Sequence, residues 1–571
     1  METAEKTAEK TARKTLVLVF PPITISTSPP LGIAMLKGYA ERQLPDWDVK
    51  LLDLNLWFLN NILPDLETGA SKFSEKIFAQ IGASREELLQ AAKVMRGVDN
   101  DIMLSRPDIY EHCGGVFSRF IEFTTKMLAA DCAEWERSQR LTPMLKDCIG
   151  QILALKPTIV GVSMIFSEQL PVGAALGRFL RQQAKLKVFM GGSCLIDGAV
   201  HFMKWYPEAA DVIVAGDGEE PLRQLLSNDG NPKGVAGAVY WESGQVVKEP
   251  PIFHKDVDQF GIPDFGGLDL NTYYSPEPVI PLLLSRGCYW RKCTFCVHYF
   301  SAGDTYRVRS LDAIIEVLQH FVDKGLRNFS FVDEMIAPGQ FVRLAEAIKN
   351  SGMDITYYAY SKPNRTFTPA VLKSIAESGC KFLLWGLESG NQRILDLMGK
   401  GTEVKEVAEV MKNAHAAGIA NHVFVICGFP TETHGEFADT LNFLNDNRDY
   451  IYAINSGPFG LDAGAPIAKN PEKFGIVQTW VQGNTPLGEQ LAYRCTSGVT
   501  MEESWQNFLR ALPFFRPFHP HANLIAYYRD HALLVYKHLG AKLYPEYRRF
   551  PPMAKILPAA LETNPVEQRV A

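Results

Sequence analysis

Three cysteines close together, Cys288, Cys293 and Cys296, are the residues whose type and spacing most directly predict chemistry. They lie in SRGCYWRKCTFC, a loop after a short apolar run that we expect to form a strand. Thiolates are soft ligands, and three of them in one short loop favour an iron–sulfur cluster or zinc. The other seven cysteines are scattered through the 571 residues, which is too sparse for a disulfide scaffold and indicates free thiols.

The spacing Cys-x4-Cys-x2-Cys leaves two alternatives open. Plant-type two-iron ferredoxins share this spacing but need a fourth cysteine, and the next one along the chain is Cys380, 84 residues after Cys296. A structural zinc site would also need a fourth ligand, for which His298 is the nearby candidate.

The N-terminal region alternates strand and helix patterns and predicts an α/β, doubly wound (Rossmann-like) sheet over residues 15–230. Residues of about 57–147 lack strand patterns and predict an inserted helical block, and residues 1–14 read as a flexible tail. Ligands of such sheets bind beyond the carboxyl ends of the strands. The residues that we expect at this edge, and expect to bind a large ligand, are Pro30, Leu31, Gly32, Gly161, Ser163, Gly191, Gly192, Gly216, Gly218 and Glu219.

Residues 231–275 read as a hairpin and linker. Five further strand and helix patterns over residues 276–470 predict a partial (β/α) TIM-like barrel, whose chemistry belongs at the carboxyl ends of its strands. Cys288 follows the first strand, Asp333 and Glu334 the second, and Glu388 and Ser389 the fourth. Residues 471–571 are rich in aromatic residues and predict a helical C-terminal cap.

Composition narrows the possible partners and the compartment. The net charge of -6 gives no broad basic field, so we expect no nucleic-acid partner. We also expect no membrane association and a cytoplasmic protein, because the sequence contains neither a long apolar run nor an N-terminal signal segment.

Beyond these patterns, the sequence resembles the radical S-adenosylmethionine (SAM) enzymes that carry a cobalamin-binding domain. SRGCYWRKCTFC, FSFVDE, GLESGNQRILDLMGKG and GFPTET resemble the barrel of this family, and PPLGIAMLKGYA, VFMGGS and VAGDGEEPL resemble its cobalamin domain. The family spacing is Cys-x3-Cys-x2-Cys, whereas this chain has one more residue between the first two cysteines.

The resemblance implies three cofactors: a [4Fe-4S] cluster on the three cysteines, SAM and cobalamin. It places the edge residues of the N-terminal sheet around cobalamin. The pattern Asp-x-His-x-x-Gly, which supplies a histidine ligand to cobalt in other corrinoid proteins, does not occur in the first 230 residues, so the resemblance implies cobalamin bound without that ligand. For Arg307 and Arg309 an ion pair with Asp or Glu inside the protein is an equal alternative. The residues that it places around SAM are Phe295, His298, Arg307, Arg309, Asp333, Glu334, Glu388, Ser389, Val425 and Gly428.

The function that the resemblance implies is methylation of an unactivated carbon of a natural-product or peptide substrate, with an external flavodoxin- or ferredoxin-type electron donor. Two alternatives stay open: a cyclase or rearrangement enzyme with the same cofactors, and a non-catalytic corrinoid or iron–sulfur carrier. A tRNA methylthiotransferase should carry a second cysteine trio and a basic C-terminal module, and neither is visible in the sequence.

Overall fold

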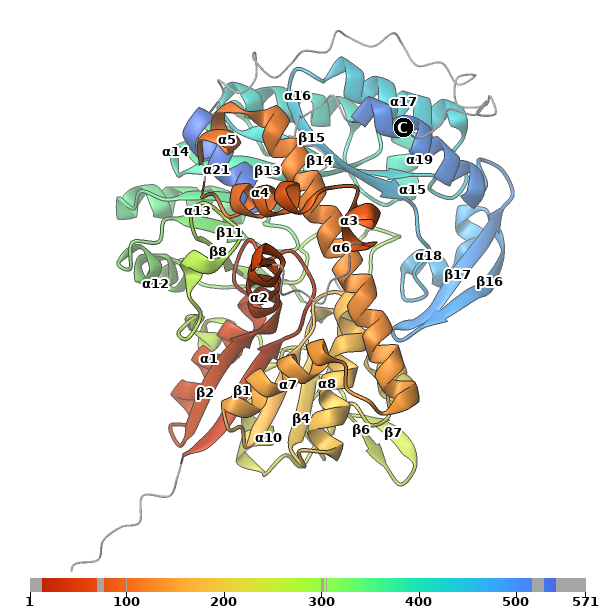
Figure 1. Ribbon diagram of the computed structural model, residues 1–571. Coiled ribbons are helices and arrows are strands. Elements are labelled where there is room, and N and C mark those ends of the chain that lie inside the picture. The colour runs from red at the N-terminus through yellow and green to blue at the C-terminus, as the bar shows by residue number, and fades with distance from the viewer. Residues whose placement is uncertain are drawn as a thin grey trace, which may run out of the picture.

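The computed structural model describes residues 13–68, 76–98, 100–298, 302–303, 305–515 and 528–540. Most of the predicted tail and much of the predicted C-terminal cap, residues 1–12, 516–527 and 541–571, lie outside this part of the chain. The described residues form two α/β bodies, one above the other in Figure 1, and the α/β class expected from the sequence is confirmed. No helix among them is long and apolar enough to cross a membrane.

The lower body contains a sheet of seven strands in the order β2-β1-β3-β4-β5-β6-β7. Its first five strands are parallel, and their order places the topological switch point between β1 and β3. The hairpin predicted within 231–275 pairs antiparallel with β5, so it extends this sheet. The strands are β1 (Lys14–Phe20), β2 (Trp47–Asp53), β3 (Ile159–Ser163), β4 (Lys187–Gly191), β5 (Val212–Val214), β6 (Ala238–Glu242) and β7 (Gln245–Lys248).

Alternation along β1 explains how this sheet is covered on both faces. Val17 and Val19 face one core with α7, α8 and α9, whereas Leu16 and Leu18 face the other core with α1 and α10. Successive residues of a strand point to opposite faces, so an apolar run such as TLVLVF requires helices on both sides. These helices are α1 (Leu31–Gln43), α7 (Pro143–Ala154), α8 (Leu170–Gln182), α9 (Ala199–Trp205) and α10 (Glu219–Ser227).

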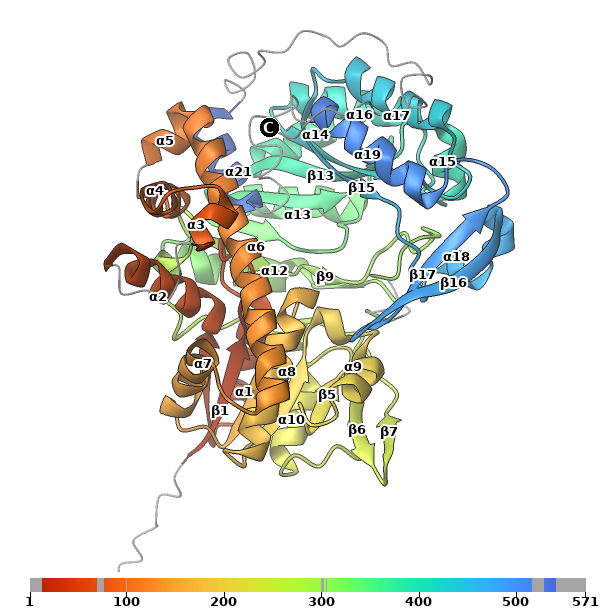
Figure 2. The same cartoon turned by 45° about the vertical axis from the view of Figure 1, so that its right-hand side comes forward.

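The inserted helical block connects the two bodies. Its longest helix, α6 (Pro107–Ser138), has 32 residues and runs alongside both bodies in Figures 1 and 2. Near its start Tyr110 lies against His531, and near its end Trp135 lies 5.4 Å from the guanidinium of Arg178 on α8. The other helices of the block are α2 (Leu54–Thr68), α3 (Lys76–Ile81), α4 (Arg85–Met95) and α5 (Asn100–Ser105).

The upper body is an open barrel of six parallel strands in the order β15-β14-β13-β12-β11-β8. Five of them were predicted; β15 was missed because its second half, NSGP, is unfavourable for a strand. The strands are β8 (Val279–Leu282), β11 (Asn328–Phe331), β12 (Thr356–Ser361), β13 (Cys380–Glu388), β14 (Ala420–Cys427) and β15 (Ile451–Pro458). The helices between them are α12 (Leu311–Val322), α13 (Pro338–Ser351), α14 (Pro369–Glu377), α15 (Gln392–Leu397), α16 (Val404–Ala416) and α17 (His434–Asp446).

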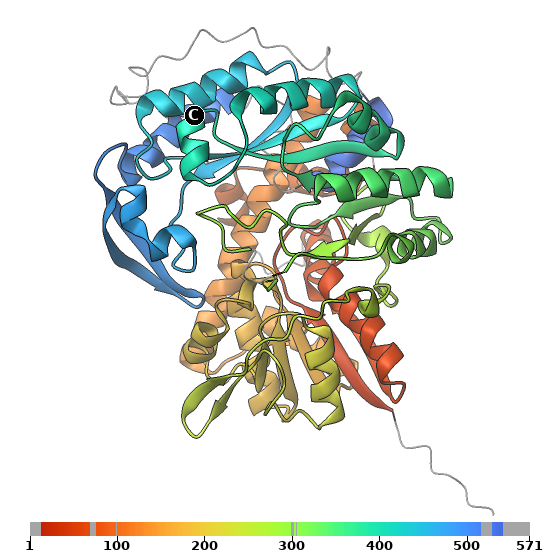
Figure 3. The same cartoon turned by 180° about the vertical axis from the view of Figure 1, so that it is seen from behind.

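The C-terminal region differs from the all-helical cap expected from the sequence. After α18 (Pro466–Lys469), strands β16 (Ile476–Thr485) and β17 (Gly488–Cys495) form a hairpin that descends to the lower body in Figure 3, where Leu487 packs against Gly198. Helix α19 (Met501–Phe515) then packs against β14 and β15. Helix α21 (Arg529–Leu539) fills the inside of the open barrel, where Leu534 and Tyr536 share a core with Phe382.

Candidate functional site

The cysteine loop lies at the carboxyl end of the barrel, beyond the short strand β9 (Ser285–Arg286). The extra residue between Cys288 and Cys293 is accommodated by a left-handed backbone conformation at Arg291, whose φ is +55°. The indole Nε1 of Trp290 donates a hydrogen bond of 2.8 Å to the carbonyl of Gly399, which holds the longer loop against the protein.

The loop rests on the segment Gly399-Lys400-Gly401, which follows α15. The backbone N–H of Thr294 donates to Met398, and its hydroxyl donates to Leu397. A Cβ on Gly399 would lie 2.4 Å from the carbonyl oxygen of Lys292, and one on Gly401 would lie 2.2 Å from the Trp290 ring. Both glycines also have positive φ, so this close approach requires glycine at both positions.

Two buried lysines, Lys362 and Lys400, lie beside the thiols. Lys362 follows β12, and its ammonium lies 3.0 Å from the centroid of the Trp290 ring and donates to the carbonyls of Lys400 and Gly401. Burial and the neighbouring ammonium of Lys400 lower the pKa of Lys362 to about 8, against the opposing influence of Cys293 and Cys288. Burial would lower the pKa of Lys400, but Glu388 and the same thiols hold it above its usual value.

The three thiols form a ligand set that fits an iron–sulfur cluster, and the two lysine cations lie beside it. All three thiols lie within electrostatic range of one another, and burial raises the pKa of Cys293 and brings that of Cys296 to about 12. Thiolate ligands to iron are negatively charged, so two adjacent buried ammonium groups compensate charge that the loop alone would leave unbalanced. Sequence reasoning missed these lysines, because lysine is ordinarily exposed.

Neither alternative cysteine site finds its fourth ligand in this arrangement. Cys380 is the first residue of β13, whereas Glu388, the last residue of the strand, contacts Lys400 beside the loop. Eight residues of strand separate them by about 25 Å, so Cys380 cannot join the three loop cysteines as a ligand. The imidazole Nδ1 of His298 lies 3.5 Å from the carboxylate of Glu334. The described residues contain no three His, Cys, Asp or Glu side chains placed to hold a single metal ion.

The residues predicted around SAM separate into two groups. Glu334 and His298 line the large cavity described below, at the mouth of the barrel. Asp333 is turned away from it, because its carboxylate accepts hydrogen bonds from the Leu284 backbone and the Ser285 hydroxyl. Burial raises the pKa of Asp333 to about 6, and its contacts show that it holds the start of the cysteine loop.

The residues after β13 and β14 are also engaged within the protein. Glu388 pairs with Lys400 at 2.8 Å, and Ser389 shares a hydrogen bond with Thr440 on α17. The backbone N–H of Gly428 donates to Glu432, whose pKa is raised to about 8 by burial. Val425 is buried in the barrel core, and Phe295 packs against the cluster of apolar residues that includes Ile394 and Phe459.

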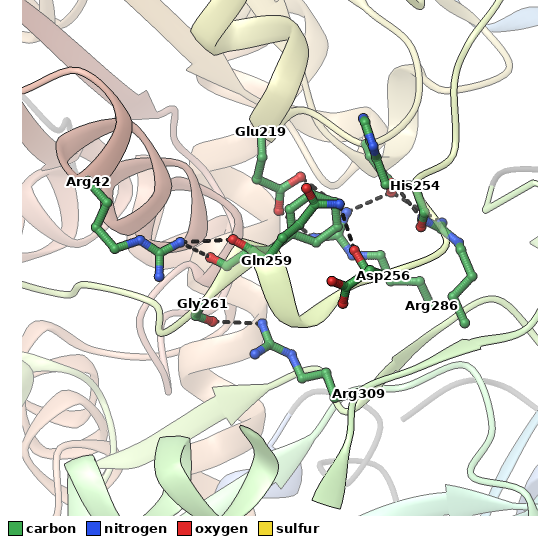
Figure 4. A network of polar contacts seen from close by, with 11 residues as sticks. Arg42, Glu219, His254, Asp256, Gln259, Gly261, Arg286 and Arg309 are labelled. Carbon is green, nitrogen blue, oxygen red and sulfur yellow. Dashed lines mark hydrogen bonds and ion pairs between the residues drawn. The ribbon is translucent and has the colours of Figure 1, made fainter. Parts of the chain in front are cut away.

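For Arg307 and Arg309, the structure shows contacts within the protein. Arg307 lies in β10 (Arg307–Val308) and pairs with Asp217, which follows β5 of the lower sheet. Arg309 donates to the carbonyl of Gly261 in the linker, as Figure 4 shows. In the described part of the chain the hydrogen bonds of both arginines go to residues other than the three cysteines, whereas Lys362 and Lys400 lie beside Cys293.

Arg286 joins the two bodies two residues before Cys288. Its guanidinium pairs with Asp217 at 2.6 Å and with Glu219, and it lies 4.4 Å from the centroid of the Phe260 ring. The linker passes through the same network, because Arg42 of α1 donates to the carbonyls of Gln259 and Phe260 (Figure 4). The turn after β5 and the cysteine loop are thus held together by buried, charge-assisted contacts.

A cavity of about 1230 Å³ lies between the two bodies. All ten residues predicted at the edge of the lower sheet line it, from Pro30 after β1 to Glu219 after β5. Ser285, Arg286 and Gly287, which lead into the cysteine loop, line its other side. Its volume exceeds the several hundred Å³ of an ordinary small-molecule pocket, so one large ligand and a second molecule can share it.

Sequence reasoning missed the cavity residues that come from α6, β12 and α21. They include Arg119 and Lys126 on α6, Tyr358 and Tyr360 on β12, and Arg529 on α21. The tyrosines alternate along β12 in YYAYS, a pattern that identifies one face of the strand. No sequence signal identified which face of the isolated helices α6 and α21 would meet the cavity.

Comparison with known proteins gives a family match and a set of solved structures of similar fold, among them OxsB and TsrM. Residues 282–444 match the family model of the radical SAM superfamily. An uncharacterised methyltransferase of Pyrococcus horikoshii is 30% identical over 313 residues, which cover 53% of this chain and 67% of that protein.

The two solved structures resemble the chain over most of its length. The cobalamin-dependent SAM radical enzyme OxsB matches with a TM-score of 0.60 and 14% identity over 88% of this chain and 67% of that one. The radical SAM methyltransferase TsrM of Kitasatospora setae matches with a TM-score of 0.56 and 15% identity over 82% of this chain and 80% of that one. At these identities the likeness is one of fold.

Proposed function

This chain belongs to the radical SAM superfamily, and from that membership we propose that it is a cobalamin-dependent radical SAM methyltransferase. Its substrate is a small molecule or peptide, methylated at an unactivated carbon, and its electrons come from a flavodoxin- or ferredoxin-type donor. The observation that carries the proposal is the shared cavity, which the flanks of the cysteine loop border on one side and the glycine-rich sheet edge on the other.

Cys288, Cys293 and Cys296 would hold the [4Fe-4S] cluster, with Lys362 and Lys400 balancing its charge. When bound, the cluster and SAM supply a 5′-deoxyadenosyl radical, and methylcobalamin supplies the methyl group. Glu334, which lines the cavity at the barrel mouth, would accept a hydrogen bond from the methionyl amine. The backbone around Val425 and Gly428 would face the adenine, as the family resemblance implies.

The edge of the lower sheet would hold cobalamin. Gly161, Gly191, Gly192 and Gly216 line the cavity at the strand ends, where a large flat ligand would approach. At Gly161 and Gly192 packing within the sheet also requires glycine, because a Cβ would meet Leu18 or the backbone of Met164. No histidine of the lower sheet is among the described residues that line the cavity. His201 lies on α9 beside the tip of the β16–β17 hairpin. The proposal is therefore cobalamin bound without a histidine ligand from the described residues of the lower sheet.

Anaerobic reconstitution with iron, sulfide and hydroxocobalamin tests the proposed function. We expect about one corrinoid retained per chain and, after reduction with SAM and substrate, S-adenosylhomocysteine beside 5′-deoxyadenosine. Failure to retain any corrinoid contradicts the proposal. 5′-Deoxyadenosine without S-adenosylhomocysteine would instead favour a cyclase or rearrangement enzyme, and retained cofactors without SAM cleavage would favour a carrier.

Replacing Lys362 with methionine is expected to lower the midpoint potential of the cluster. A unit charge within about 10 Å contributes on the order of 1–2 kcal/mol at an effective dielectric near 20, which is tens of millivolts for one electron. Electron paramagnetic resonance during a redox titration measures the shift. Lys362→Arg should retain most of the potential, and Lys373→Met, at an exposed position of α14, should not change it. An unchanged potential in Lys362→Met would contradict this role.

A further inference from the structure

The cavity contains an arginine, Arg529, whose charge the described residues leave available. Its Nη1 donates to the hydroxyl of Tyr360, and its guanidinium lies 5.4 Å from the centroid of the Tyr360 ring and 5.7 Å from that of Phe424. Its Nε is buried without a hydrogen-bond partner. Among the described residues no carboxylate lies within 4 Å of it, whereas Arg286 in the same cavity is paired with two.

Arg529 is held in place by its neighbours. Aromatic contacts from two strands, β12 and β14, fix the plane of the guanidinium. The adjacent Asp530 uses its two oxygens elsewhere, because Oδ2 accepts from Thr27 at 2.7 Å and Oδ1 accepts from Tyr358 at 3.2 Å. A fixed guanidinium with N–H donors that no described residue engages is prepared to bind an oxyanion with little loss of side-chain entropy.

The position of Arg529 is between the two proposed cofactor sites. Through Asp530 its helix contacts Thr27, which lies in the loop after β1, at the sheet edge proposed for cobalamin. Through Tyr360 it contacts β12, whose next residues lead to Lys362 beside the cysteine loop. A carbon that must meet both the radical and the methyl donor has to lie between these sites, so a substrate group near Arg529 is well placed.

The cavity also has an apolar wall. Ile165, Phe166 and Val332 line it and are 37%, 47% and 38% exposed, although large apolar side chains are usually buried. Ile165 and Phe166 follow β3 of the lower sheet, and Val332 follows β11 of the barrel. The cavity therefore combines apolar surface from both bodies with the fixed cation of Arg529, which is complementary to a molecule with an apolar part and an anionic group.

We propose that Arg529 binds an oxyanion, a carboxylate or a phosphate, of the substrate, and so selects an anionic substrate with an apolar body. This inference rests on the proposed function, because it assumes that the cavity is the substrate site. Charge-assisted hydrogen bonds from arginine to such groups are among the strongest in proteins and are bidentate when the geometry allows. Removing the cation should cost binding of the anion without a comparable loss for a neutral analogue.

Matched probes test the inference on the reconstituted holoenzyme with saturating SAM, so that the site for the methionyl carboxylate is filled. The probes are 3-phenylpropanoate, its neutral amide 3-phenylpropanamide, and phenyl phosphate. We expect the wild-type protein to bind at least one of the two anions about tenfold more tightly than the amide. Preference for 3-phenylpropanoate alone would identify a carboxylate site, and preference for phenyl phosphate alone would identify a phosphate site.

In Arg529→Gln the ratio of anion to amide affinity should fall to about one, and in Arg529→Lys it should be intermediate. Lys126→Met is the matched control, because Lys126 lines the same cavity but its ammonium is paired with Glu122 at 2.6 Å. It should keep the wild-type ratio. An unchanged ratio in Arg529→Gln, loss of preference only in Lys126→Met, or no preference or no binding in the wild type overturns the inference.

Corrinoid retention and SAM cleavage in the same preparations separate this inference from the proposed function. Retained corrinoid and 5′-deoxyadenosine without an anion preference would overturn only the role of Arg529. A preference that depends on Arg529, in a protein that neither retains corrinoid nor cleaves SAM, would overturn the proposed function and leave an anion site. Corrinoid retention at the wild-type level also shows that Arg529→Gln and Arg529→Lys are folded.

Discussion

Replacing Cys293 with alanine is expected to abolish the iron–sulfur cluster and, with it, SAM cleavage. Two remaining thiolates cannot hold a cluster that is built on three, so iron and acid-labile sulfide should fall to the level of the untreated apoprotein. Formation of 5′-deoxyadenosine should drop at least about 100-fold, because the reaction has no other electron path to the sulfonium in this proposal. Iron and sulfide analysis and chromatography of the nucleoside products measure both effects.

Two further measurements show whether the effect of Cys293→Ala is specific to the cluster. Corrinoid retention should be unchanged, because the residues proposed to bind it lie on the other sheet. Cys380→Ala is the matched control, because this buried thiol lies at the opposite end of β13 from the cysteine loop. The Cys380→Ala protein should therefore keep its full iron content. A full cluster in Cys293→Ala would contradict the assignment of Cys293 as a cluster ligand. Loss of the cluster in Cys380→Ala would indicate that Cys380 is a fourth ligand, as in a ferredoxin-type site.

Replacing Arg286 with methionine is the second substitution with a large expected effect. It leaves Glu219, whose side chain is 3% exposed, without its cationic partner, and it removes one of two partners from Asp217. Breaking a buried ion pair from one side typically costs about 3–5 kcal/mol, because a buried charge is left uncompensated. We expect the thermal midpoint to fall by several degrees and the linker between the bodies to become more sensitive to limited proteolysis.

The double variant Arg286→Met with Glu219→Gln distinguishes charge imbalance from a simple loss of contact. It removes the unpaired carboxylate while Arg307 still compensates Asp217, so it should recover much of the lost thermal stability. Iron content should follow the same order, since the network holds the start of the cysteine loop. Equal destabilisation of the single and double variants would show that the ion pair is not what joins the bodies.

Much of the fold was predictable because its signals are local. Apolar strands such as TLVLVF require helices on both faces, and the order of alternating elements places the glycine-rich turns at one edge. The ten residues predicted there do line the cavity, and their role as cobalamin contacts stays a prediction. The cysteine loop is equally visible, because its ligands are neighbours in sequence.

The remaining parts of the site depend on contacts between distant segments. Lys362 and Lys400 are 38 residues apart and meet in the folded protein, where Lys362 donates to the carbonyl of Lys400 and Trp290 packs against both neighbourhoods. For Arg307 the sequence left SAM and an ion pair as equal alternatives, because its partner, Asp217, is 90 residues away in the chain and follows a strand of the other sheet. The β16–β17 hairpin was missed because β16 is mostly exposed and mixes polar with apolar residues, so it lacks the buried strand pattern.

The length of α6 has a consequence for the separation of the two bodies. Because the helix contacts α21 near its start and α8 near its end, its rise of 1.5 Å per residue fixes the spacing between those contacts. One residue inserted at its middle would add only that distance but would rotate the second half by about 100°, turning Trp135 away from Arg178. The number of residues in α6 is therefore under a stricter constraint than the identity of most of them, and natural length variation in this helix should occur in steps that preserve its phase.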